Sequence, residues 1–262
     1  MSGVRGNIKY LYLFQLFTNI LIIIFLKVTN VNMYVLLIIA IILVLGICIY
    51  IYFNDQDSKI DQKFYEVSDI YPKLNGIYKH LDNIKDELNE DQYWQDWPEK
   101  ELYRTANKSW KIIPFKIFDK KHKSNHNKFP ALWKFIESVP DVEIAILSKL
   151  EAGMKLNWHK GWGSHSNNIL RCHFGLKVPS KNSCLIAVAD DDVNGDPGKR
   201  EIKYHKQDKW LIFDDSKFHL AENNSEFDRI VLIMDLKRPK HVKRGTSTVE
   251  ESPELLKILA TI

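Results

Sequence analysis

Long apolar runs occur in this 262-residue chain almost only before residue 54. Residues 10–26 are apolar apart from a few uncharged polar side chains, and residues 33–53 carry no charge. A helix needs roughly 20 apolar residues to cross a bilayer. The pattern therefore predicts an integral, multi-pass membrane protein, anchored by a hairpin of two transmembrane helices over about 10–26 and 33–53.

The flanking charges indicate how such a hairpin would be oriented. The short turn between the two runs contains one basic residue, Lys27. Arg5 and Lys9 precede the first run, and Lys59 and Lys63 follow the second. The positive-inside rule then predicts that the rest of the chain lies in the cytosol. If the first run instead lies in the membrane interface, the topology inverts and the location is lumenal. Removal of the apolar region as a targeting segment is the weaker alternative.

Helical periodicity follows the anchor. Apolar residues recur three and four positions apart over residues 61–90. Pro72 interrupts this pattern, so we expect one helix to end or kink near Tyr71 and a second to run to about Leu88. A shorter helical pattern precedes Pro140.

After Pro140, short apolar or alternating runs separated by turn residues predict β-strands. The expected strands are 142–150, 169–178, 184–189, 201–204, 210–213 and 230–236. Short strands at this spacing predict a mainly β sandwich or barrel, and a jelly roll is the form that leaves a ligand cavity between its sheets. The expected division is 1–53 membrane anchor, 54–140 helical lead-in, 141–240 jelly-roll core and 241–262 C-terminal tail.

Composition narrows the class of partner. The net charge of +4 is spread along the chain, so nucleic acid is not indicated. A locally basic stretch, residues 116–128, is typical of a solvated surface, although it would also attract anionic headgroups. The three cysteines form no disulfide framework. Cys48 lies in the second apolar run, and Cys172 and Cys184 lie in expected strands, where they are interpreted as core residues in a reducing compartment.

Two histidines at expected strand ends suggest a metal site. His159 and His219 are followed by Arg229, ten residues after the second histidine. A non-haem Fe(II) oxygenase normally binds its metal through two histidines and one carboxylate. Here the residue two after His159 is Gly161. From the residues alone, the site is a dead site, a two-histidine oxygenase or a site of other chemistry.

Two arginines point to an acidic ligand. Arg171 and His173 share one face of an expected strand, because side chains two apart in a strand point the same way. Burying an unpaired cation is costly, so an anion in the cavity or a buried ion pair would have to compensate Arg171. Arg229 is suited to a bidentate grip on a carboxylate. The arginines and histidines together imply an acidic small molecule near a metal.

Other polar residues receive a structural interpretation. Asp214 and Asp215 precede His219 and invite assignment as the third ligand, but Asp commonly bonds nearby backbone amides in turns. We therefore expect them to form a turn. Five further histidines do not belong to the pattern formed by His159, His219 and the two arginines, and they are interpreted as surface residues: His122, His126, His165, His205 and His241.

The motifs that match a known family run from residue 145 to residue 239. They are Ser148 with His159 eleven residues later, Arg171-Cys172-His173-Phe174-Gly175-Leu176, Leu211-Ile212-Phe213-Asp214-Asp215-Ser216, His219, Arg229 and Asp235-Leu236-Lys237-Arg238-Pro239. This stretch resembles the aspartyl/asparaginyl β-hydroxylase family of Fe(II)- and 2-oxoglutarate-dependent dioxygenases. The resemblance implies a double-stranded β-helix, the jelly roll of cupin-like proteins.

The resemblance also implies roles for the site residues. His159 and His219 would ligate Fe(II) as the catalytic pair, and Arg229 would hold the distal carboxylate of 2-oxoglutarate. Ser148, Arg171 and His173 would line the cosubstrate pocket, mainly at its other end. Members of the family carry glycine where the carboxylate ligand is expected, so Gly161 fits an active enzyme. One aromatic residue of the pocket is left open between Trp110 and Phe115.

The implied reaction uses O2 and 2-oxoglutarate to hydroxylate an unactivated carbon. The substrate is either an Asp or Asn side chain of a polypeptide or a lipid acyl chain, and the membrane anchor favours a membrane-proximal substrate. The loop 160–170 is expected to border the entrance. An iron halogenase and a non-catalytic jelly-roll module that binds an acidic ligand are the alternatives.

Overall fold

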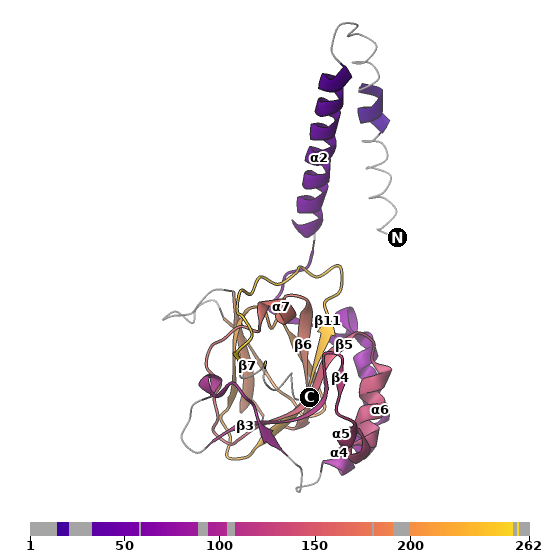
Figure 1. Cartoon of the computed structure of the whole chain (residues 1–262). Helices are drawn as coiled ribbons and strands as arrows, with labels where there is room; N and C mark the ends of the chain where they lie inside the picture. The colour runs from indigo at the N-terminus through magenta and orange to yellow at the C-terminus, as the bar shows by residue number, and fades with distance from the viewer. Residues whose placement is uncertain are drawn as a thin grey trace. The chain divides into compact units, whose positions relative to one another are not determined.

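The computed structural model describes residues 15–20, 33–57, 59–88, 94–103, 108–179, 181–190, 200–253 and 256. The chain divides into two compact units, Met1–Ser58 and Lys59–Ile262, and each is described by itself. Figure 1 shows a helical first unit and a second unit built mainly of strands.

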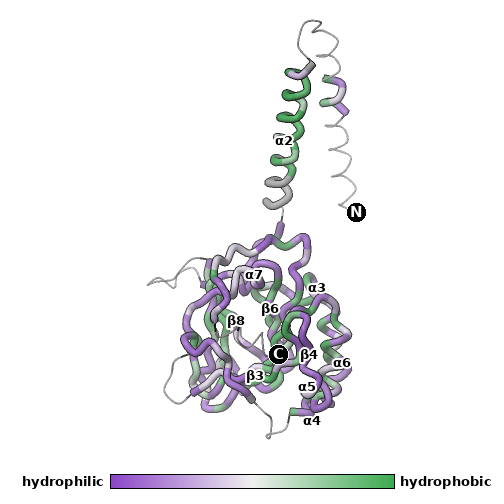
Figure 2. The backbone as a smooth tube through the Cα atoms, viewed as in Figure 1, coloured by the Kyte–Doolittle hydropathy of each residue, from purple (hydrophilic) through white to green (hydrophobic). Residues whose placement is uncertain are grey.

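The first unit contains helix α2 (Met33–Asp57). Over Tyr34–Ile51 its mean hydropathy is 3.1 and its side chains are exposed, so α2 is long and apolar enough to cross a membrane. Figure 2, coloured by the hydropathy of each residue, shows α2 as hydrophobic along most of its length. Residues 15–20 are helical, but most of the first predicted span lies outside the described residues. Within the described part, one candidate span is found, and the two-helix hairpin is not confirmed.

The second unit contains two antiparallel sheets. The larger runs in the order β1-β9-β6-β11-β5-β3-β2, with β4 beside β3, and the smaller in the order β10-β7-β8. The larger sheet comprises β1 (Phe64–Tyr65), β2 (Gln95–Asp96), β3 (Trp110–Ile117), β4 (Lys120–Lys121), β5 (Val142–Leu150), β6 (Ile169–Lys177), β9 (Trp210–Phe213) and β11 (Arg229–Lys237). The smaller comprises β7 (Cys184–Ala189), β8 (Glu201–Tyr204) and β10 (Phe218–Asn223).

The two sheets face each other as a jelly roll. Residues directly opposite in neighbouring strands share a face, and the register places Ser148 opposite Val231 and His173 opposite Ile233. Val231 and Ile233 belong to a buried cluster that also contains Ile186 of β7 and Ala221 of β10. The inner face of the large sheet therefore packs against the small sheet, and the polar side chains Ser148 and His173 project into this interior.

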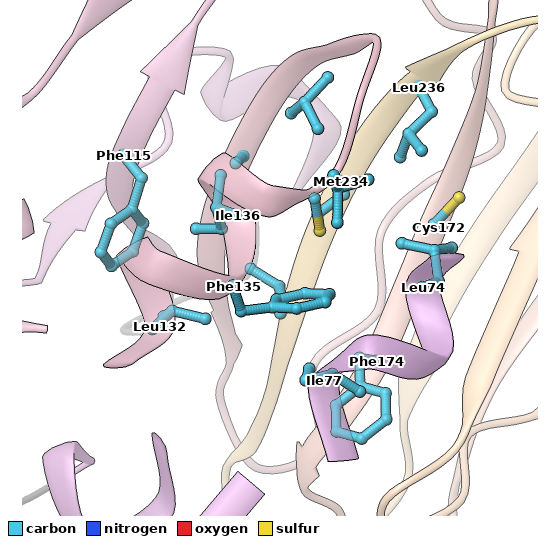
Figure 3. Packing of buried hydrophobic residues seen from close by; sticks show 14 of the residues in the cluster. Leu74, Ile77, Phe115, Leu132, Phe135, Ile136, Cys172, Phe174, Met234 and Leu236 are labelled. Carbon is cyan, nitrogen blue, oxygen red and sulfur yellow. The ribbon is translucent and has the colours of Figure 1, made fainter. Parts of the chain in front are cut away.

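Helices cover the opposite face of the large sheet (Figure 1). They are α3 (Val67–Ile70), the 3₁₀ helix η1 (Pro72–Lys79), α4 (Leu81–Glu87), α5 (Lys123–Lys128) and α6 (Pro130–Ser138). Figure 3 shows Leu74 and Ile77 of η1 and Phe135 of α6 packed beside Phe174 and Met234 of the sheet. Two short helices, η2 (Lys100–Leu102) and α7 (Gly163–Ser166), lie in loops of the jelly roll.

The strands expected from the sequence are all present, with bounds that differ by one residue at most. The helix end near Tyr71 and the end near Leu88 are also confirmed, since these residues cap α3 and α4. The prediction of helix from residue 61 was wrong at its start, because Phe64 and Tyr65 pair with β9. Pro72 starts a 3₁₀ helix rather than a second α-helix.

Strands β3 and β10 were not expected from the sequence. Pro114 cannot donate a ladder hydrogen bond, and the register of β3 shifts between Pro114 and Lys116. This irregularity hid the alternation of β3. Segment 155–159 pairs with β10 only through two isolated bridges, Lys155–Glu222 and His159–His219, so it extends the small sheet without forming a regular strand.

Truncating a side chain between the helices and the sheet should strongly lower the free energy of unfolding. Phe135 is fully buried between α6 and the sheet. Phe135→Ala should lower the free energy of unfolding by about 3–5 kcal/mol, because it leaves a cavity in a close-packed layer. Phe227, with 67% of its surface exposed, provides the control, and Phe227→Ala should change stability by no more than about 0.5 kcal/mol. Urea titration of the full chain in detergent measures both free energies of unfolding. An equal decrease in the two variants would contradict this packing.

Candidate active site

His159 and His219 are held together by the backbone. The amide of each donates a hydrogen bond to the carbonyl of the other, with N–O distances of 3.0 and 2.8 Å. The two ring centroids lie 4.2 Å apart. Residues sixty positions apart thus present their imidazoles side by side at the edge of the small sheet.

The ring nitrogens of this pair are arranged for metal binding. His159 Nδ1 lies 2.7 Å from the Asn157 carbonyl oxygen, and His219 Nδ1 lies 2.9 Å from that of Lys217. A carbonyl only accepts, so each Nδ1 carries the proton and each Nε2 presents a lone pair. Burial lowers the pKa of His159 to about 3, with a further contribution from His219, and burial lowers the pKa of His219 to about 4. Both rings are therefore neutral at physiological pH, the form that binds metals.

The carboxylate of Asp215 fills the space that a side chain at position 161 would occupy. A Cβ on Gly161 would lie 2.0 Å from Asp215 Oδ2. The Gly161 amide donates to the Asp215 carbonyl at 2.8 Å, and Asp215 Oδ1 lies 3.3 Å from His219 Nε2. Only glycine fits at this position. In the part of the chain that the structure describes, no three His, Cys, Asp or Glu residues are arranged to hold a metal, and metal binding by the two histidines stays a prediction.

Arg171 is the centre of a buried ion network. Its Nε and Nη2 atoms each donate to Asp235 at 2.8 Å, and its Nη1 lies 2.6 Å from Asp215 Oδ1. His165 Nε2 lies 2.9 Å from Asp235. The interpretation of His165 as a surface residue was therefore wrong, because it completes the buried surroundings of Asp235. Arg171 also borders the cavity beside His159. Its contact with the cosubstrate stays a prediction.

Asp214 forms the expected turn. Its Oδ1 accepts hydrogen bonds from the Ser216 amide at 3.0 Å and the Ser216 hydroxyl at 2.6 Å. Arg238 closes a salt bridge to the same carboxylate at 2.7 Å. Asp215 takes a different part, since its side chain pairs with Arg171 rather than with the turn.

Arg229 is a buried cation in the interior of the jelly roll. Only 2% of its surface is exposed, and among the described residues neither Nε nor Nη1 has a hydrogen-bond partner. Burial lowers its pKa to about 10, so the guanidinium remains charged at neutral pH. A buried charge without a counter-ion is strongly unfavourable. The arrangement is suited to an anion that enters between the sheets.

Ser148 and Trp110 line the same interior face. Trp110 Nε1 donates to Ser148 Oγ at 2.9 Å, which leaves the hydroxyl proton free to donate elsewhere. Phe115 lies on the other face of β3, in edge contact with Phe129 under the helices. Of the two aromatic residues left open by the sequence, Trp110 is thus the one inside the jelly roll.

His173 and His205 form a second histidine pair. His173 Nδ1 lies 3.0 Å from His205 Nε2, and only 2% of His205 is exposed. The interpretation of His205 as a surface residue was wrong, because the turn after β8 folds its ring inward. Its backbone amide donates to the Cys184 carbonyl at 2.8 Å. Burial lowers the pKa of both rings well below the usual histidine value, so both are neutral.

A cavity of about 450 Å³ opens beside His159. Its walls combine aromatic and apolar side chains with charged and polar ones; they include Trp97, Glu99, Glu101, Leu102, Trp110, Lys160, Trp162, Arg171, Asp215, Phe218, Val249 and Glu250. Glu99 accepts hydrogen bonds from the indoles of Trp97 and Trp162 at 3.1 and 3.0 Å. Lys160, Gly161 and Trp162 of the loop 160–170 line this cavity, and its use as the substrate entrance stays a prediction.

The C-terminal segment closes one side of this cavity. The Gly163 amide donates to the Val249 carbonyl at 2.7 Å, and the Ser247 hydroxyl donates to the Gly161 carbonyl at 2.6 Å. Residues after 240 are therefore part of the cavity wall, a role that no motif in the sequence indicated.

Gly161 provides a test of the site's packing. Gly161→Ala should lower the free energy of unfolding by about 1–3 kcal/mol and weaken Fe(II) binding, because the new methyl group displaces the Asp215 carboxylate. Gly76→Ala is the matched control, since its Cβ would meet its nearest neighbour at 3.9 Å. Urea titration and anaerobic Fe(II) titration measure the two effects. Equal behaviour of the two alanine variants would contradict the close approach of Asp215.

The buried neutral histidines predict acid sensitivity. Below pH about 6.5 the unfolded chain protonates histidines that the folded chain keeps neutral, so the free energy of unfolding falls as pH drops from 7 to 5. Each such histidine contributes up to about 1.4 kcal/mol per pH unit. His205→Gln should reduce this slope, whereas the change at the exposed His241, His241→Ala, should not. Urea midpoints measured across this pH range give the dependence of stability on pH for the wild type and the two variants. The same dependence in all three proteins would contradict the burial of His205.

Comparisons with known proteins agree with this architecture. The sequence profile of the aspartyl/asparaginyl beta-hydroxylase family matches residues 78–239. An ornithine lipid ester-linked acyl 2-hydroxylase from Rhizobium tropici is 31% identical over 130 residues, which cover 50% of this chain and 42% of that protein. The match thus spans less than half the length of that relative.

The solved structures to which the chain is similar have low sequence identity. HygX from Streptomyces hygroscopicus, solved with nickel and 2-oxoglutarate bound, has a TM-score of 0.46 at 11% identity and covers 78% of this chain and 95% of its own. An oxidoreductase of the 2OG-Fe(II) oxygenase family from Burkholderia pseudomallei has a TM-score of 0.42 at 8% identity, covering 64% and 81%. The profile match extends over more than half of the sequence, and the chain belongs to the aspartyl/asparaginyl beta-hydroxylase family.

Proposed function

We propose that this chain is an Fe(II)- and 2-oxoglutarate-dependent dioxygenase that hydroxylates an unactivated carbon of a lipid acyl chain. The observation that carries the proposal is the pairing of His159 and His219, whose Nε2 atoms carry lone pairs, in the jelly roll that also buries Arg229, whose Nε and Nη1 have no hydrogen-bond partner among the described residues. This donor set fits a divalent metal ion together with an anionic chelator.

Each residue has a defined task in this proposal. His159 and His219 would hold the iron, and Arg229 would hold one carboxylate of 2-oxoglutarate through paired N–H donors. Ser148 and His173, on the same interior face, would donate to the cosubstrate. Iron and 2-oxoglutarate, when bound, supply the oxidation of the substrate by O2, with loss of carbon dioxide to give succinate.

Arg171 would act beside the metal through its carboxylate partners. It binds Asp215 and Asp235 together, and so keeps the Asp215 carboxylate in the space next to Gly161. A negative charge in that space disfavours chloride there, which argues against an iron halogenase. A non-catalytic binding module would not require two imidazoles with matched Nδ1–H bonds to carbonyls.

The cavity favours a lipid as substrate. Its walls of tryptophan, leucine, valine and phenylalanine suit an apolar chain better than the short polar side chain of Asp or Asn. The relative from Rhizobium tropici acts, by its name, on an acyl group of a lipid. Helix α2, with its mean hydropathy of 3.1, would anchor the protein at the membrane where such lipids lie.

The anchor and the domain limits belong to the same proposal. Residues 1–53 would form the membrane anchor as a two-helix hairpin, with a helical lead-in over 54–140 and a jelly-roll core over 141–240 in the cytosol. The exposed apolar surface of α2 supports the second of the two spans.

The test compares lipids and peptides in cells that express the wild type, His159→Ala, His219→Ala or the control His241→Ala. The wild type and the control should produce lipids that carry one added oxygen on an acyl chain. Each ligand variant should lower succinate formation by at least about 100-fold without loss of thermal stability.

Mass spectrometry of lipid extracts and of digested protein measures both substrate classes. Added oxygen on Asp or Asn residues, with unchanged lipids, would show that the substrate is a polypeptide and not a lipid. Undiminished succinate formation in either ligand variant would contradict the proposed iron site.

A further inference from the structure

The His173–His205 pair contains a proton whose position decides what the pocket can bind. The two rings are nearly parallel, with an interplanar angle of 11° and centroids 5.3 Å apart, and the Nδ1 of His173 lies 3.0 Å from the Nε2 of His205. Both rings are neutral, so one of these two nitrogens donates and the other accepts.

The outer nitrogens of the pair are unpartnered. His173 Nε2 and His205 Nδ1 are buried and find no hydrogen-bond partner in the described ranges, and the same holds for Arg229 Nε and Nη1. His173 shares the interior face with Val231 and Ile233 of β11, the strand that begins at Arg229. Burial lowers the pKa of both histidines, and the charge of Arg229 contributes to this lowering.

The proton between the two rings has two possible arrangements, and they differ at His173 Nε2. If His205 Nε2 donates, His173 Nδ1 accepts and His173 Nε2 carries a proton. If His173 Nδ1 donates instead, His173 Nε2 is a bare lone pair. A carboxylate accepts but does not donate, so only the first arrangement lets His173 bind it.

We propose that His205 is a positioning residue for the cosubstrate: it donates from Nε2 to His173 Nδ1 and so holds His173 in the tautomer whose Nε2–H donates to a carboxylate of 2-oxoglutarate. The proposal rests on the proposed function of the site. It assigns to His205 a role that its place in the sequence, just after an exposed strand, did not indicate.

Three variants separate the hydrogen bond from packing. Gln places an amide N–H close to the position of the histidine Nε2, so His205→Gln retains a donor. His205→Leu fills similar space without a donor, and His205→Glu offers an acceptor. Each is compared with the wild type as full chain in detergent, loaded anaerobically with Fe(II), by calorimetric titration with 2-oxoglutarate.

We expect the affinity for 2-oxoglutarate to depend on whether residue 205 has a hydrogen-bond donor and not on the size of its side chain. His205→Gln should bind 2-oxoglutarate within about 3-fold of the wild type, whereas His205→Leu and His205→Glu should bind at least about 10-fold more weakly, the loss typical of one neutral hydrogen bond. The KM for 2-oxoglutarate should rise in step, with little change in kcat at saturation. Equal losses in His205→Gln and His205→Leu would overturn the proposal.

A second readout does not depend on the variants. In the wild type labelled with ¹⁵N-histidine, His173 should show a protonated Nε2 and a bare Nδ1, and His205→Gln should keep this pattern. A proton on His173 Nδ1 would overturn the proposal even if the variants failed to fold. Absence of 2-oxoglutarate binding by the wild type would contradict the proposed function itself, whereas binding with no difference among the variants would refute only the role of His205.

Discussion

The site depends on the backbone bridge between His159 and His219. Two reciprocal amide-to-carbonyl hydrogen bonds fix the spacing of the two imidazoles before any ligand enters. The carbonyls of Asn157 and Lys217 then set the tautomers. Because every one of these contacts involves main-chain atoms, the spacing and the tautomers of the two imidazoles follow from the pairing of segment 155–159 with β10.

Beside the bridge, glycine at 161 and an ion network are packed against each other. Asp215 occupies the space that a side chain at 161 would need, and Arg171, which also binds Asp235, holds Asp215 there. A chain that carried a carboxylate at 161 could not keep Asp215 in this place. Gly161 is thus one part of a compensated arrangement.

Sequence reasoning found the strands and the candidate site where the signal is local. Six of the strands from Val142 onward alternate or run apolar between turn residues, so their bounds could be read directly, whereas β10 was not expected. The ion partners of Arg171 could not, because Asp235 lies sixty-four residues away and only the register of β6 with β11 places the two side chains opposite each other. His205 was missed for the same reason, since the strand before it is exposed and its own burial comes from contact with His173. The wall formed by residues 247–250 likewise arises from contacts with the loop after His159.

In the proposed site, iron binds to two histidines with no protein carboxylate among its ligands. Iron X-ray absorption of the anaerobic full chain, with and without 2-oxoglutarate, measures these ligands. We expect scattering from two imidazole ligands in both states, replacement of oxygen ligands by the cosubstrate chelate, and a weaker imidazole signal in His159→Ala. An unchanged iron spectrum in Asp215→Ala is expected as well. A carboxylate ligand that disappears in Asp215→Ala would contradict the two-histidine site.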